Sequence, residues 1–167
     1  MDAFVQPLYE LADFDAIIRQ LKKPGIVQVS GCLDSQKAHF TNGLLREFPF
    51  RLIVAENDLK AKAFYEDFRL YDPEVLYYPA RDLIFYQADI HGNLLTRQRI
   101  QVLRALLERE EVTIVTSIDS CLDCLVPLAV WKEKVIKIRN DSEIDLDRMK
   151  RHLLELGYEW AAQGEGP

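Results

Sequence analysis

The chain has 167 residues, of which 49% are hydrophobic and 29% are charged, a composition typical of a folded globular protein and not of a disordered or fibrous one. Its 27 Asp and Glu residues outnumber its 21 Lys and Arg residues, which gives a formal net charge of −6. Proteins that bind nucleic acids directly usually carry a basic surface that neutralises phosphates, so the charge argues against DNA or RNA as a direct ligand.

Helix-like and strand-like segments alternate through the first three quarters of the chain. The apolar periodicity predicts helices over 14–21, 38–48, 61–68 and 95–109, and β-branched runs predict strands over 26–30, 51–55, 75–78 and 112–116. The segment 79–92 has no clear period and is predicted to be a surface loop. Because parallel strands need crossover connections, this alternation predicts an α/β layered domain with a parallel sheet over residues 1–126.

The pattern changes after Pro127. Polar and apolar residues alternate over 134–138, as in a half-exposed edge strand, and an apolar stripe through Leu146, Met149 and Leu153 predicts a helix that ends at Gly157. No later segment contains an element that could close a fold. We therefore predict that residues 127–167 are the start of a smaller α+β domain that is cut short.

The turn after the first predicted strand resembles a phosphate-binding loop. Such a loop reads G-x-x-x-x-G-K-[ST] between a strand and a helix, and Gly31 and Lys37 stand at the required separation. Gln36 replaces the glycine that aims backbone N–H groups at phosphate oxygens, and Ala38 replaces the hydroxyl that binds Mg²⁺. Asp34 adds a negative charge where phosphates would lie. The prediction is a degenerate loop (Gly31, Gln36, Lys37 and Ala38) with no bound nucleotide, cofactor or metal and no catalytic residue.

Other side chains that could bind a metal or react lack the further residues that such a site would need. Cys121 and Cys124 form a C-x-x-C pair, but Cys32 is the only further cysteine, so a four-ligand zinc site is not predicted, and packing against the sheet is favoured over a redox centre. The histidines are isolated, and the arginines Arg97, Arg99 and Arg104 are predicted to lie on a solvated helix face.

The chain shows no sign of export or membrane insertion. No apolar run approaches the roughly 20 residues of a transmembrane helix, and residues 1–10 lack the basic and apolar regions of a signal peptide. Three cysteines are too few for a disulfide scaffold. We expect a cytoplasmic protein without a membrane partner.

The order of these segments resembles a known family. The degenerate loop is followed by YPARDLIFY over 78–86, RQRIQVLRAL over 97–106, VTIVTS over 112–117, LVP over 125–127 and LGY over 156–158. This order is similar to the N-terminal, UvrB-like region of bacterial transcription-repair coupling factor (Mfd). The resemblance implies a fold like the first α/β domain of UvrB, related to P-loop NTPases, but without the intact phosphate loop of UvrB.

The resemblance also implies a function. It points to a non-catalytic segment that helps recruit UvrA of nucleotide excision repair to stalled RNA polymerase. ATP, Mg²⁺, RNA polymerase and double-stranded DNA would be bound by domains of a longer, ATP-dependent DNA translocase that are absent here. The candidate UvrA-facing region is a basic stretch whose first residues are Lys132, Lys134, Lys137 and Arg139. An equal alternative is that this stretch is simply a solvated surface.

Two other functions stay open on the sequence alone. One is a nucleotide-binding α/β hydrolase that uses an atypical phosphate loop around Lys37. The other is a stand-alone flavodoxin-like or receiver-like signalling domain, for which Glu56 and Asp58 would supply an acidic cluster at a strand end.

Overall fold

The computed structural model describes residues 3–80, 89–136, 138 and 143–160. The chain divides into two compact units, Met1–Cys124 and Leu125–Pro167. The predicted domains, 1–126 and 127–167, remain predictions.

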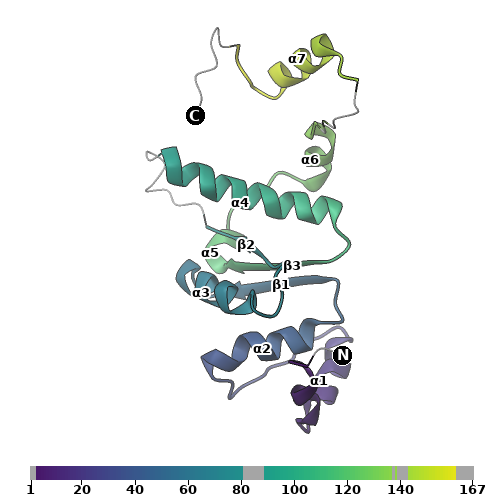
Figure 1. The fold of residues 1–167 in the computed structure, drawn as a ribbon, viewed down its shortest axis with the longest axis vertical. Helices are drawn as coiled ribbons and strands as arrows, with labels where there is room; N and C mark the ends of the chain where they lie inside the picture. The colour runs from purple at the N-terminus through teal and green to yellow at the C-terminus, as the bar shows by residue number, and fades with distance from the viewer. Residues whose placement is uncertain (1–2, 81–88, 137, 139–142, 161–167) are drawn as a thin grey trace. The chain divides into compact units, whose positions relative to one another are not determined.

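A parallel sheet with helices on both faces forms the centre of the first unit (Figure 1). Its strands are β1 (Phe50–Ala55), β2 (Leu76–Tyr78) and β3 (Val112–Ser117), in the order β1-β3-β2. Both neighbouring pairs are parallel, and Leu52 and Leu76 flank Ile114 in register. The structure therefore confirms the predicted α/β class with a parallel sheet.

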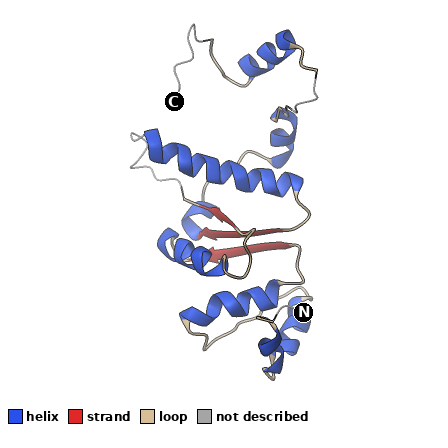
Figure 2. Cartoon of the chain, in the orientation of Figure 1, coloured by secondary structure: helices blue, strands red, loops and turns tan. Residues whose placement is uncertain are grey.

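Helix α3 (Asp58–Phe68) covers one face of the sheet and α4 (Asp89–Glu108) covers the other (Figure 2). On the α3 face the buried cluster comprises Ala38, Ala61, Phe68, Val75, Tyr77 and Val115. On the α4 face it comprises Leu76, Tyr78, Val102, Ala105, Val112 and Ile114. The alternation of side chains along each strand separates these two cores.

Three short elements complete the amino-terminal part of this unit. They are η1 (Gln6–Glu10, a 3-10 helix), α1 (Phe14–Leu21) and α2 (Asp34–Leu45). Val5, Leu8, Phe14 and Ile18 form a small core of their own, against which Phe40 and Leu44 of α2 pack. Gly43 lets α2 approach closely, because a Cβ there would clash with Leu8 Cδ1. After β3, the four-residue helix α5 (Ile118–Cys121) ends the regular structure of the unit.

The predicted strand over 26–30 is wrong. The segment forms no strand, Ile26 is 94% exposed and Val29 is 42% exposed. A strand needs a neighbour to take up its backbone hydrogen bonds, and none of the described strands pairs with this segment. A β-branched run of five residues is thus not sufficient for a strand.

The second unit contains α6 (Leu128–Lys134) and α7 (Leu146–Glu155). Asp145 caps α7, since its side chain accepts hydrogen bonds from the backbone N–H groups of Asp147 and Arg148. The predicted edge strand over 134–138 is wrong for its described residues: Lys134 ends α6, and no strand includes Val135, Ile136 or Ile138. Lys137 lies outside the described residues.

Candidate functional site

The degenerate phosphate loop lies at the beginning of α2. The helix begins at Asp34, four residues earlier than predicted, so Gln36, Lys37 and Ala38 belong to its first turns. Gly31 has φ +86° and turns the chain just before the helix. Without the predicted strand in front of it, the segment does not have the complete strand–turn–helix framework of a phosphate loop.

Backbone donors that a phosphate would need are already used within this turn. The N–H of Leu33 donates to Gln36 Oε1 at 3.2 Å, and the N–H groups of Gln36 and Lys37 donate to the Leu33 carbonyl at 2.9 and 3.2 Å. The side chain of Gln36 therefore caps the helix instead of leaving an open ring of donors. This arrangement leaves these three N–H groups unavailable to a phosphate unless the turn rearranges.

Lys37 is directed towards a neighbouring carboxylate. Its Nζ lies 2.6 Å from Asp34 Oδ1 in an exposed ion pair. The hydrogen bond and charge of Lys37 lower the pKa of Asp34, and Asp34 raises the pKa of Lys37 in turn. The ammonium charge that would attract phosphate is thus compensated within one helical turn.

Ala38 points into the core and not into the loop. It is 2% exposed and packs in the cluster that contains Ala61 and Phe68 of α3. A metal-binding hydroxyl would have to face the phosphates from this position. Replacing Ala38 with serine would therefore not by itself restore a magnesium ligand.

A second polar group of residues lies at the carboxyl end of the sheet, where α/β proteins usually bind ligands. Asp58, the first residue of α3, accepts hydrogen bonds from the N–H of Ala80 at 3.1 Å and from Ser117 Oγ at 3.4 Å. The hydroxyls of Ser117 and Ser120 lie 2.9 Å apart and are buried. Because these bonds join strand ends to α3 and α5, Asp58 serves as a structural link, and this use does not favour the receiver-like alternative.

Tyr77 supports the same link. Its hydroxyl donates to the backbone carbonyl of Asp58 at 3.4 Å. Burial, together with the interactions with Asp58, raises the pKa of Tyr77 above its ordinary value, so the phenol remains protonated. It therefore cannot act as a phenolate base at neutral pH.

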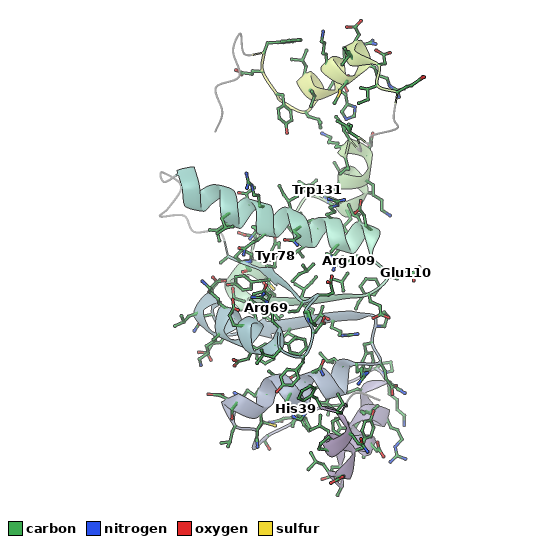
Figure 3. The ribbon with its side chains drawn as sticks, viewed as in Figure 1. His39, Arg69, Tyr78, Arg109, Glu110 and Trp131 are labelled. Atoms are coloured by element: carbon green, nitrogen blue, oxygen red, sulfur yellow. The ribbon has the colours of Figure 1, made fainter. Side chains whose placement is uncertain are left out.

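Arg99 is buried, so its predicted place on a solvated helix face is wrong. It is 7% exposed, and its Nη2 lies 2.8 Å from Asp123 Oδ2. Its Nη1 donates to the Pro79 carbonyl at 2.8 Å, and its guanidinium carbon lies 4.2 Å from the centre of the ring of Tyr78, a residue that Figure 3 labels. Arg104 on the same helix is exposed, as predicted. The spacing of the arginines along the helix could not distinguish Arg99 from Arg104. The difference arises because Asp123, the partner of Arg99, lies in a distant segment that follows β3.

The basic stretch is described only in part. Lys132 and Lys134 are exposed in the last turn of α6, where their charges favour the helix dipole. Lys137 and Arg139 lie outside the described residues. The exposed position of the first two lysines is compatible with either a binding surface or a solvated one.

The remaining candidates do not assemble into a reactive site. Cys121 and Cys124 are exposed, which contradicts the predicted packing against the sheet, and Cys32 is partly exposed. His39 bonds to the Phe4 carbonyl and stacks on Tyr71. Within the described ranges, no group of three or more His, Cys, Asp or Glu side chains is suited to a metal ion. None of the helices in that part of the chain has the length and hydrophobicity of a membrane span.

Comparison with known proteins places these features in context. The chain is 28% identical to the transcription-repair-coupling factor of Bacillus subtilis over 95% of its own length. It is 29% identical to UvrABC system protein B (UvrB) of Treponema denticola over 86% of its length, and 31% identical to that of Anaplasma phagocytophilum over 68%. The chain is homologous to transcription-repair-coupling factors and to UvrB. No protein-family model matches it.

This homology confirms the resemblance that the order of sequence segments indicates. The UvrB-like chain spans only 14% of the Bacillus factor and 20% of each of the two UvrB proteins.

Proposed function

We propose that this chain is a non-catalytic protein-interaction segment of nucleotide excision repair, in transcription-coupled repair, that helps to recruit UvrA. ATP hydrolysis, RNA polymerase binding and movement on double-stranded DNA then belong to other parts of a longer coupling factor. Homology to transcription-repair-coupling factors and to UvrB supports the repair role. The observation that supports the non-catalytic role is that the groups of the loop at α2 are already paired with one another. Gln36 caps the helix, and Lys37 pairs with Asp34.

The first test is nucleotide binding. Titration of the chain with Mg-ATP in a calorimeter is expected to give no saturable heat in the micromolar range, because the donors of Leu33, Gln36 and Lys37 are engaged within the turn. The Lys37→Ala variant should behave identically. Saturable binding that is lost in Lys37→Ala would instead support the hydrolase alternative.

The second test is UvrA binding. The immobilised chain is expected to retain purified UvrA at low salt, where attraction between exposed charges is least screened. Reversing two charges in K132E/K134E should weaken retention about tenfold if these lysines face UvrA. The matched control K23E/K62E makes the same change in net charge with exposed lysines of the first unit. Absence of retention by the unaltered chain would contradict the docking role, and equal effects of both double variants would contradict the assigned surface.

A further inference from the structure

A cavity of about 830 Å³ opens at the amino ends of β1 and β3, the end of the sheet opposite to the α2 loop and Asp58. Its walls come from the end of α2, the start of β1, the turn between α3 and β2, and the turn between α4 and β3. The last of these turns carries Arg109 and Glu110, which Figure 3 labels. All of these elements belong to the first unit.

The wall of the cavity includes the amide side chain of Asn42. Asn42 is only 8% exposed, yet its side-chain amide makes no hydrogen bond to any of the described residues. The amide atoms are not sealed from solvent, so they can be reached from the cavity. A carboxamide offers both a donor and an acceptor, which matches the C=O and N–H groups of a peptide backbone.

The charges around the cavity favour a cationic ligand. Its wall carries four carboxylates, those of Asp72, Glu74, Glu110 and Glu111, and three arginines, Arg46, Arg51 and Arg109. Arg51 is held by Asp72 at 3.7 Å and Glu111 at 3.6 Å, and Arg109 is held by Glu74 at 3.1 Å. Glu110 has no ion pair within the described part of the chain.

Arg51 also stiffens the wall. Its Nε donates to the Phe48 carbonyl at 2.6 Å and its Nη1 donates to Thr113 Oγ1 at 3.2 Å, and Thr113 Oγ1 donates to Asp72 Oδ2 at 2.7 Å. These bonds fix the floor of the cavity, while Glu110 and Glu111 remain exposed beside it. At the rim, Glu110 is therefore a carboxylate without an ion pair among the described residues, and Glu111 is 75% exposed beside its pairing with Arg51.

We propose that this cavity binds an arginine-bearing peptide segment of a partner protein. The guanidinium group pairs with Glu110 and shares the exposed carboxylate of Glu111 with Arg51, and the backbone amide next to it pairs with Asn42. The site lies in the first unit and is separate from the lysines of α6, so it stands whether or not those lysines bind UvrA.

The test uses N-acetyl-arginine amide as the probe, with N-acetyl-citrulline amide as an uncharged analogue of the same shape. Titration into the ¹⁵N-labelled full chain is expected to shift the Asn42 side-chain amide and the Thr113 backbone amide saturably, in the millimolar range. Citrulline amide should bind at least threefold more weakly. Absence of saturable shifts with the arginine probe, equal binding of citrulline, or stronger binding of N-acetyl-glutamate amide would each overturn the proposal.

Variants separate binding from folding. E110Q/E111Q should weaken arginine binding about three- to tenfold, as expected for two exposed ion pairs. The control E133Q/E155Q removes the same charge from the second unit and should leave binding unchanged. Asn42→Ala should also weaken binding, without loss of folded structure, because its amide gives up no hydrogen bond within the described chain. Equal effects of the two double variants would show a non-specific charge effect and contradict the site.

Discussion

Replacing Arg99 with alanine is expected to lower the free energy of unfolding of the first unit by about 3 kcal/mol, the order found when one partner of a buried ion pair is removed. The change removes the ion pair with Asp123, the hydrogen bond to the Pro79 carbonyl and the guanidinium that lies over the Tyr78 ring. Urea denaturation followed by far-UV circular dichroism measures the loss. Fluorescence is less suitable, because both tryptophans, Trp131 and Trp160, lie in the second unit.

Arg104→Ala is the matched control for Arg99. It removes the same side chain from the same helix, but Arg104 is exposed and forms an ion pair with Glu108, one turn away: Arg104 Nε lies 2.8 Å from Glu108 Oε2. The loss should stay within about 0.5 kcal/mol. Equal losses in the two variants would mean that the buried contacts of Arg99 do not stabilise the unit.

The Phe68→Ala variant should lose about 3 to 5 kcal/mol of stability, the range for an aromatic side chain removed from a packed core. Phe68 is fully buried at the end of α3, where it stacks on Phe64 and packs in the same cluster as Ala38 and Val115. The same urea denaturation measures this loss. Because the core joins α2, α3 and β3, the transition should also remain cooperative but shift to lower urea.

Leu59→Ala provides the comparison within α3. Leu59 is 80% exposed, so its removal from the folded state leaves no cavity. A change of no more than about 0.5 kcal/mol is expected. A large loss in Leu59→Ala, or a small one in Phe68→Ala, would contradict the assignment of the core to this face of the sheet.

The contrast between two segments shows how far apolar patterning predicts this fold. The run over 112–117 is β-branched and becomes the central strand β3, buried at every residue. The run over 26–30 looks similar in sequence, but it is exposed and unpaired. Strand propensity is local, whereas pairing depends on a neighbouring edge, so the sequence could not distinguish these two segments.

For the candidate site, residue types alone predict which atoms a phosphate loop would lack. Gln36 and Ala38 cannot supply the glycine backbone and the hydroxyl of a phosphate loop, and this follows from residue type alone. What the sequence could not indicate is how the turn uses its remaining groups. The capping of α2 by Gln36 and the burial of Ala38 depend on where the helix begins and what packs against it.

The amino-acid sequence by itself determined the α/β class, most of the helices and the relationship to UvrB-like proteins, because these depend on periodicity and on the order of segments. Only the tertiary structure decided that Arg99 is buried, that residues 26–30 form no strand, and that Asn42 faces a charged cavity. Arg99 is buried where it pairs with Asp123, and the cavity is lined in part by the turn after α4. The segment 26–30 has no neighbouring strand among the described strands. Each outcome is decided by parts of the chain that are distant in sequence. Local patterns carry no information about such partners.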